Sequence, residues 1–334
     1  MVSDLASKSG NTSLVQKVIR LRVLSLTVVA VIMAVFFSFA SGRFLTRTNL
    51  TQMLIEMSLV IIVGVGEALV LISKNIDVSI GSIVGFSAYF TADFASKHPT
   101  LPLVIIVGVA ILIGLVLGSL NGLIISNLGV PSIMVTLGTL YIYRGLDSIL
   151  AGASQVTSQN LPKSFNRIAG WSLFGIPGMF IYALIVCAIA WIFLQHTYAG
   201  RSLLALGNNP SAAKKMGIKS RKWIFIVYAL SGSLAGFAGV LWSARYGTVD
   251  SSTATGYELV VLAAVVVGGI NVNGGTGSIG GVLVGASILG IISVGLSLLN
   301  VSQFWVQAIQ GAAIIVAISS DMIINKRLRR KGAK

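Results

Sequence analysis

The stretch QHTYAGRSLLALGNNPSAAKKMGIKSRK (195–222) separates two long apolar runs and is the longest basic interruption in the chain. It holds no acidic residue, and its cations are Arg201, Lys214, Lys215, Lys219, Arg221 and Lys222. Positive charge concentrated between two apolar runs is typical of a loop on the cytoplasmic side of a membrane. The stretch therefore predicts that the runs on either side of it span a membrane.

The composition of the whole chain supports the same fold class. Of its 334 residues, 55% are hydrophobic and 10% are charged, whereas a soluble domain has about 25% charged residues. The apolar runs are continuous and do not alternate with period two, which indicates helices and not a barrel. We expect an all-α polytopic membrane protein.

Reading the chain for apolar stretches long enough to cross a bilayer predicts about ten transmembrane helices. The expected spans are 22–41, 51–73, 78–96, 102–126, 130–150, 177–195, 223–243, 257–270, 279–299 and 303–323. The eighth is short and runs into a glycine-rich segment, so eight spans with a re-entrant segment is the alternative. A membrane domain over 22–323 then lies between a cytoplasmic tail at 1–21 and a basic tail at 324–334.

The positions of the basic residues predict the orientation. With both termini in the cytoplasm, 17 of the 24 Lys and Arg residues lie on the cytoplasmic side and 7 on the other. This asymmetry favours an N-in, C-in topology. The net charge of +15 is accounted for by these topology signals, so no nucleic-acid partner is expected.

The sequence contains no recognisable catalytic or metal-binding motif. The single cysteine, Cys187, excludes a disulfide, and the two histidines, His98 and His196, are nearly a hundred residues apart. GGINVNGGTGSIGG (268–281) lacks the lysine of a phosphate-binding loop. We expect Gly268, Gly269, Gly274 and Gly275 to serve sharp turns and close helix packing. The chain is therefore expected to bind no metal and to be no enzyme.

Polar residues inside the expected spans are the candidates for a transport pathway, since ionisable groups in a bilayer are costly. They are Glu56, Glu67, Asn121, Thr136, Tyr141 and Arg144. Glu56 and Glu67 would share one helix face roughly 16 Å apart. Asp147 follows Arg144 by three residues, which predicts an ion pair on one helix. Asp77 is expected to cap a helix start, and Gly81 with Gly85 to allow tight packing.

Four segments resemble the signature regions of bacterial sugar-type ABC importer permeases, the group that includes ribose, xylose, rhamnose and autoinducer-2 permeases. They are NIDVSIGSIVG (75–85), GVPSIMVTLGTLYIYRGL (129–146), YAGRSLLALGNNPSAAKKMGI (198–218) and VVGGINVNGGTGSIGGVLVGA (266–286). The segments occur in the family's order and cover essentially the whole chain. Pro131–Ser132 departs from the family, which commonly has an aromatic residue after this proline. The NID tripeptide resembles the autoinducer-2 and rhamnose permeases more than the ribose ones.

The resemblance implies a membrane-spanning permease subunit that imports a sugar or sugar-like molecule. It implies three protein partners: a cytoplasmic ATPase that binds ATP and Mg²⁺, a second permease copy or paralogue, and an extracytoplasmic binding protein. Within the coupling loop 196–222, the residues implied to enter the ATPase are Asn208, Asn209, Pro210, Ala212, Ala213, Lys214, Lys215 and Gly217. Pro210 suits a first helical turn and Gly217 suits a helix end. The alternative is a proton-coupled secondary transporter of small polar solutes, with Glu56 or Glu67 as the proton carrier.

Overall fold

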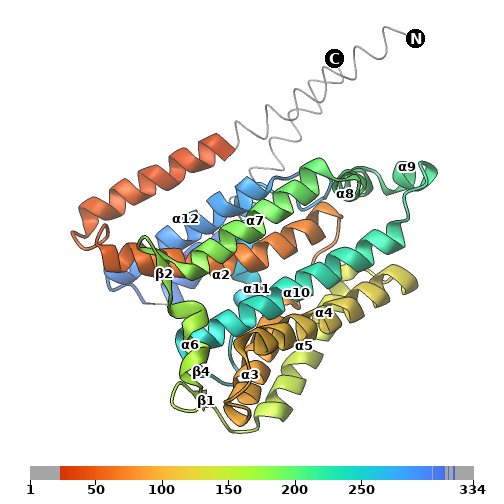
Figure 1. Cartoon of the computed structure of the whole chain (residues 1–334). Coiled ribbons are helices and arrows are strands. Elements are labelled where there is room, and N and C mark those ends of the chain that lie inside the picture. Colours follow the sequence, from red (N-terminus) through yellow and green to blue (C-terminus); the bar gives the residue numbers. More distant parts are fainter. Residues whose placement is uncertain (1–22, 303, 313–314, 316–318, 320–334) are drawn as a thin grey trace.

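The computed structural model describes residues 23–302, 304–312, 315 and 319 (Figure 1). The tails expected at 1–21 and 324–334 lie outside the described residues, as does much of the tenth expected span. The described part is helical almost throughout, with two short β-pairs. The all-α membrane fold class predicted from the sequence is therefore confirmed.

The helices follow one another with short connections. After a first helix, Val23–Ala40, they are α2 (Arg47–Ile72), α3 (Ile80–Lys97), α4 (Leu103–Leu128), α5 (Ser132–Ala151), α6 (Lys163–Gly170), α7 (Gly178–His196), α8 (Tyr198–Asn208), α9 (Pro210–Lys215), α10 (Ser220–Tyr246), α11 (Tyr257–Val267) and α12 (Ile279–Leu298). The strands are β1 (Val156–Thr157), β2 (Ser172–Leu173), β3 (Ile176–Pro177) and β4 (Thr248–Val249). Residues 304–312 form a further helix.

Within the described residues, six helices are long and apolar enough to cross a membrane: Val23–Ala40, α2, α4, α7, α10 and α12. The expected spans 78–96 and 130–150 correspond to α3 and α5, which carry more polar residues. The expected eighth span corresponds to α11, which has only 11 residues and ends at Val267. The count of ten spans and their orientation stay predictions.

The centre of the bundle is α2, where 94% of the most apolar stretch is buried. It packs against α7, α10, α11 and α12. Apolar side chains almost all round this helix are typical of a helix enclosed by other helices. α2 therefore forms the core around which the other spans are arranged.

The contact between α4 and α10 is the most extensive in the bundle, and it is made by glycines. A side chain at Gly114 would collide with the backbone of Gly232, and one at Gly118 with the carbonyl of Tyr228. Small residues four apart on facing helices let the two backbones approach closely inside a membrane. The backbones of α4 and α10 are therefore in direct contact at these glycines.

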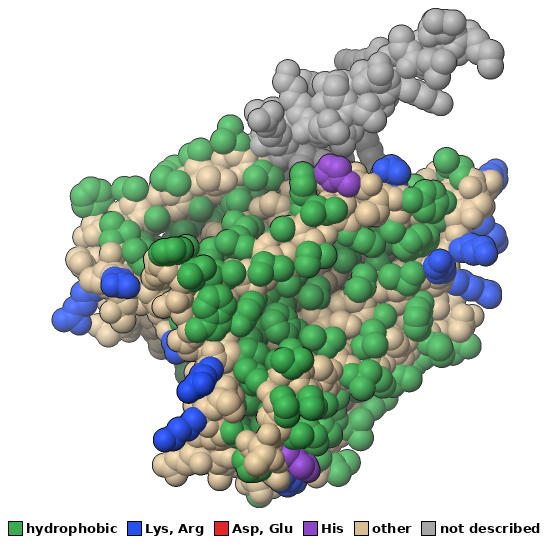
Figure 2. All heavy atoms as spheres, viewed as in Figure 1, with side chains coloured by type: hydrophobic (Ala, Val, Ile, Leu, Met, Phe, Trp, Pro, Cys, Tyr) green, Lys and Arg blue, Asp and Glu red, His purple; other side chains and the backbone are tan. Residues whose placement is uncertain are grey.

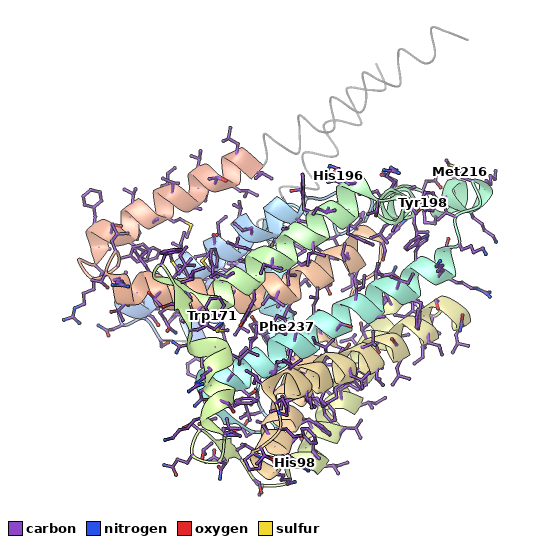
Figure 3. All side chains as sticks on the ribbon, in the orientation of Figure 1. His98, Trp171, His196, Tyr198, Met216 and Phe237 are labelled. Carbon is purple, nitrogen blue, oxygen red and sulfur yellow. The ribbon has the colours of Figure 1, made fainter. Side chains whose placement is uncertain are left out.

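The two ends of the molecule differ in character (Figure 1). One end, here called the basic end, carries α8, α9 and the start of α10. The opposite end, here called the hairpin end, carries α6 and the antiparallel pairs β1–β4 and β2–β3. At the hairpin end Trp171 donates a hydrogen bond to the Tyr182 hydroxyl at 2.7 Å, and the Tyr182 ring packs against Phe237 (Figure 3). These contacts fix the hairpin end to α7 and α10.

Candidate functional site

The segment 195–222 contains two short consecutive helices, α8 and α9, and is not the open loop that its polarity suggested. α8 begins at Tyr198, capped by the Thr197 hydroxyl, which accepts from the amide of Gly200 at 3.1 Å. α9, from Pro210 to Lys215, lies within the segment 208–217 that the resemblance implies to enter the ATPase. Asn208, the first residue of that segment, is the last residue of α8. α8 was not predicted, although Leu203 and Leu206 on its buried side follow helical spacing.

Local sequence accounts for both ends of α9. Asn209 accepts a hydrogen bond from the amide of Ala212 at 3.0 Å, and Pro210 occupies the first turn. An asparagine cap followed by proline is a favourable helix start. Gly217 has φ +80°, a left-handed conformation that glycine adopts without strain. The six residues are therefore held as a helix by their own sequence.

α9 is anchored by a small apolar cluster separate from the main core. The cluster consists of Leu206, Ala213 and Ile218, with Trp223 and Ile224 packed against it. Ala213 is 1% exposed, whereas Lys214 and Lys215 on the same helix are exposed. One face of α9 thus packs against the rest of the chain. The other face, which carries Lys214 and Lys215, is exposed and is here called the presented surface.

Basic and apolar side chains share this presented surface. Met216 is 76% exposed and Tyr198 is 65% exposed at the basic end (Figure 3). Figure 2 shows Lys and Arg side chains gathered where Figure 1 places α9 and the start of α10. A surface that combines exposed apolar and basic side chains is suited to protein–protein contact.

The glycine-rich segment 268–281 lies directly beneath this surface. The amide of Gly275 donates to the carbonyl of Ile72 at the end of α2, at 2.9 Å. A side chain at Gly207 would collide with that carbonyl and with the Gly275 amide. Gly275 also packs against Asn208, and Gly274 packs against Lys74. The helix that precedes α9 therefore touches the α2 end and the α11–α12 connection through backbone atoms.

Gly268 and Gly269 occupy the other end of the same segment. Gly268 lies against the Gly281 carbonyl, so that α11 and α12 approach each other closely. Gly269 has φ +94° and turns the chain out of α11.

Three of the residues considered for the pathway lie together in a buried polar cluster around the connection 73–79. Glu67 accepts from the amide of Asp77 at 3.3 Å. Asn121 donates to the Ser79 hydroxyl at 2.7 Å, and Thr136 lies beside the carbonyl of Ile76. The hydrogen bonds of these three side chains go to protein groups, so this cluster holds the start of α3 in position between α2, α4 and α5. Glu67 Oε2 is buried and has no partner among the described residues.

Asp77 lies within this cluster and also organises the start of α3. It accepts from the amide and hydroxyl of Ser79, at 3.0 and 2.6 Å. Gly81, the second residue of α3, lies against the backbone and side chain of Glu258 on α11.

Tyr141 and Arg144 lie on α5 but face different surroundings. Tyr141 is 74% exposed on the outer face of the helix. Arg144 donates to the carbonyls of Thr253 and Ala254, at 2.5 and 2.6 Å, next to Gly85. These bonds fasten α5 to the connection 247–256 at the hairpin end.

The ion pair expected between Arg144 and Asp147 is not formed. Both carboxylate oxygens of Asp147 lack a partner among the described residues, because the guanidinium extends to the two carbonyls. The ion pair found in the described part of the chain is Lys97–Asp93.

Asp250 lies in the connection 247–256, which also contains Thr253. A hydrogen bond from the Ser252 hydroxyl lowers the pKa of the Asp250 carboxyl below its usual value.

Glu56 is the pathway candidate that lines a cavity. The cavity, of about 620 Å³, lies between α2, α10, α11, α12 and the helix 304–312. It reaches the connection 247–256 and so opens towards the hairpin end. Its size falls within the range of small-molecule sites.

The other side chains of this cavity were missed in the sequence. Trp242 and Tyr246 come from the last turns of α10, Tyr257 from the start of α11, and Gln307 and Gln310 from the last described helix. The spacing of Trp242 and Tyr246 places them on one helix face. Nothing in the sequence indicates that Tyr257 and the two glutamines meet them, because this depends on how three helices pack.

A metal centre is not indicated in the described residues, where no three His, Cys, Asp or Glu side chains come together. The arrangement therefore consists of a cavity at one end, a protein-contact surface at the other, and α11 with its glycine-rich connection between them.

Comparison with known proteins identifies the family. A family model described as "Branched-chain amino acid transport system / permease component" matches residues 49–318. The D-allose transport system permease protein AlsC of Escherichia coli K12 is 33% identical, covering 90% of this chain and 91% of its own length. The galactose/methyl galactoside import permease protein MglC of the same strain is 33% identical, covering 91% and 94%.

An autoinducer 2 import system permease protein, LsrC of Escherichia coli O9:H4, is 30% identical over 90% of this chain and 88% of its own length. No solved structure matches the chain. With six candidate spans and relatives that are all importer permeases, the protein is a multi-pass protein of the inner membrane. The chain belongs to this transport permease family, and within it to the permeases of sugar-type ABC importers.

Proposed function

We propose that this chain imports a neutral sugar or sugar-like molecule, of the kind named for its allose, galactose and autoinducer-2 relatives. The observation that carries the proposal is α9, a self-capped helix with its own apolar anchor and an exposed face bearing Lys214 and Lys215. In this proposal the exposed face is received by an ATPase subunit in the cytoplasm, and the basic end is the cytoplasmic end. The hairpin end then faces the extracytoplasmic side.

The energy for transport comes, in this proposal, from ATP and Mg²⁺ bound to the ATPase. A second permease, identical or paralogous, completes the membrane unit, and a soluble binding protein delivers the sugar at the hairpin end. The contacts from α8 to the α2 end and the α11–α12 connection support this route. Movement of α9 would act on helices that also line the cavity.

Membership of the importer permease family supports ATP-driven transport over proton-coupled secondary transport. Uptake of radiolabelled D-galactose and D-allose into proteoliposomes tests this directly, with the ATPase and the binding protein present. We expect uptake that requires ATP inside the vesicle and persists when the pH gradient is collapsed. Uptake driven by a pH gradient without the ATPase would instead establish the secondary transporter.

The role of α9 is tested by reversing its charge. The double variant Lys214→Glu/Lys215→Glu is expected to weaken ATPase association, because both ammonium groups are exposed on the presented surface. Two such contacts are worth about 1 kcal/mol each at a solvated interface, so the affinity should fall about tenfold or more. Co-purification and quantitative pull-down with the ATPase measure this.

The matched control is Lys163→Glu, an exposed lysine on α6 at the hairpin end. It makes the same kind of charge reversal, at one lysine, at the far end of the molecule and should leave ATPase binding intact. If the α9 variant bound the ATPase normally and transported at full rate, the coupling assignment would be wrong.

A further inference from the structure

The cavity beside Glu56 has the composition of a ligand site and lies within one chain. We propose that it binds a neutral, hexose-sized sugar as a site of the permease itself. This inference rests on the proposed function, since it names the ligand class and the place within the chain where the imported molecule stops. Its volume of about 620 Å³ is in the range that encloses a small polar molecule.

One wall of the cavity is aromatic. The Trp242 ring lies 5.0 Å from that of Tyr257, nearly perpendicular at 83°, and 5.0 Å from that of Tyr246. Mutual packing holds the three rings in fixed orientations, which lowers the entropy lost on binding. A sugar ring has C–H groups on its faces, and a rigid aromatic wall gives them an apolar contact.

On the α2 side of the cavity, the Glu56 carboxylate is oriented to accept hydrogen bonds from hydroxyl groups. Glu56 accepts from the Gln52 amide at 3.1 Å, and the Ser293 hydroxyl lies within its hydrogen-bonding reach. Gln52 in turn accepts from Arg245. These contacts orient the carboxylate and leave it with further acceptor capacity towards the cavity, since a carboxylate can accept about four hydrogen bonds.

Tyr257 lines the cavity, and its hydroxyl is buried without a partner among the described residues. A buried polar atom without a partner is costly and calls for a water or a ligand group. Gln307 and Gln310 on the facing helix line the cavity with Glu56, and their amides add the donors and acceptors that a polyhydroxylated molecule requires.

The charges of the lining residues distinguish a sugar from an amino acid, the ligand class in the family's description. Among the described residues that line the cavity, Glu56 is the charged one. Arg245 donates to Gln52 beside Glu56 and is not one of the lining residues. An amino acid would bring a carboxylate that had no positive partner there, and burying such a group is strongly unfavourable. A neutral sugar meets no such penalty.

Binding to the full-length chain in lipid nanodiscs, without the ATPase or the binding protein, tests the inference. Radiolabelled D-galactose and D-allose are expected to bind saturably, whereas L-leucine is not. Glu56→Gln should weaken sugar binding about tenfold, because a hydrogen bond to a charged group is replaced by one to a neutral group. Trp242→Phe should weaken it to a similar degree.

The matched control for the aromatic change is Trp191→Phe on α7, where the ring lies half exposed on the outside of the bundle. This variant should bind sugar with unchanged affinity. If Glu56→Gln and Trp242→Phe bound as tightly as the parent chain, the sugar would bind elsewhere and the inference would be overturned. Saturable binding of L-leucine in competition with sugar would overturn it equally.

A second measurement does not depend on a loss of binding. In a Cys187→Ser background, which removes the single native cysteine, Ser297→Cys places a thiol at the cavity wall. D-galactose or D-allose should slow its reaction with a small maleimide, and L-leucine should not. Unchanged labelling in both sugars would contradict an occupied cavity.

The outcomes also separate this inference from the proposed function. If the assembled importer takes up a sugar in an ATP-dependent manner but the permease alone neither binds it nor protects Ser297→Cys, the cavity assignment fails and the function stands. If the importer takes up no sugar at all, the proposed function fails.

Discussion

At the scale of single residues, Arg144 shows how a charged side chain inside the bundle is used. Its guanidinium reaches two successive carbonyls of the connection 247–256 and not the carboxylate three residues along its own helix. Local spacing predicted the ion pair with Asp147, but tertiary packing offered two fixed acceptors. A planar group with several donors is suited to such a pair of carbonyls.

We therefore predict that Arg144→Ala destabilises the folded chain by about 2 kcal/mol, because two charge-assisted hydrogen bonds are lost. Arg144→Lys should recover part of this, since an ammonium group cannot match both carbonyls in the same way. Thermal unfolding in detergent measures the difference. The control is Tyr141→Ala on the same helix, which removes an exposed side chain and should change the unfolding temperature little.

At the scale of helices, the glycine contact between α4 and α10 carries a clear prediction. Gly114→Val should disrupt the pair by about 3 kcal/mol, since the new side chain would overlap the backbone of Gly232. The yield of folded protein from membranes and its unfolding temperature report the loss.

Gly108→Val on the same helix is the matched control for this change. A side chain at Gly108 meets no atom of the described chain within contact distance, and the propensity cost of the two substitutions is the same. If both variants unfolded at the same temperature, the close approach of α4 and α10 would not be contributing to stability.

The positions of many helices were predictable because a long apolar run in the sequence indicates a helix that spans a membrane. α2, α7 and α10 were expected within a few residues of their observed bounds. α8 was missed because its 11 residues mix Arg201 and Asn208 with leucines, so the segment resembles a polar loop. The pairing of Val156 with Val249 involves two residues on each side and leaves no period to detect.

The cavity was harder to predict because its residues come from several helices that are distant in the sequence. Glu56 was selected because it is a carboxylate within an apolar run, a signal that lies in the sequence alone. Tyr257 and Gln310 become neighbours of Glu56 only when α11 and the helix 304–312 pack against α2. A polar cluster assembled from distant helices has no signature in any one of them.

At the scale of the whole molecule, the two ends are connected through main-chain contacts. Gly207 at the end of α8 touches the Ile72 carbonyl and the Gly275 amide, and the latter belongs to the connection that leads back into α11. α11 in turn begins at Tyr257 in the cavity. We therefore expect a displacement at the basic end to reach the cavity through these main-chain contacts.

We predict that Gly207→Ala lowers sugar uptake several-fold while the ATPase remains bound, because the added methyl group separates α8 from the α11–α12 connection. The ratio of sugar transported to ATP hydrolysed, measured in proteoliposomes, should fall. Gly280→Ala is the control, since a side chain there has no atom within contact distance. An unchanged ratio in Gly207→Ala would show that coupling takes another route.

The separate anchoring of α9 has a consequence for how such importers diversify. Asn209, Pro210 and Gly217 shape the helix from within, and an apolar cluster shared with Leu206 of α8 anchors it. Residues 209–218 therefore form a nearly self-contained insert. Such an insert can change its exposed face without disturbing the spans that handle the sugar. In the proposed importer, we therefore expect the choice of ATPase and the choice of cargo to evolve independently in the same chain.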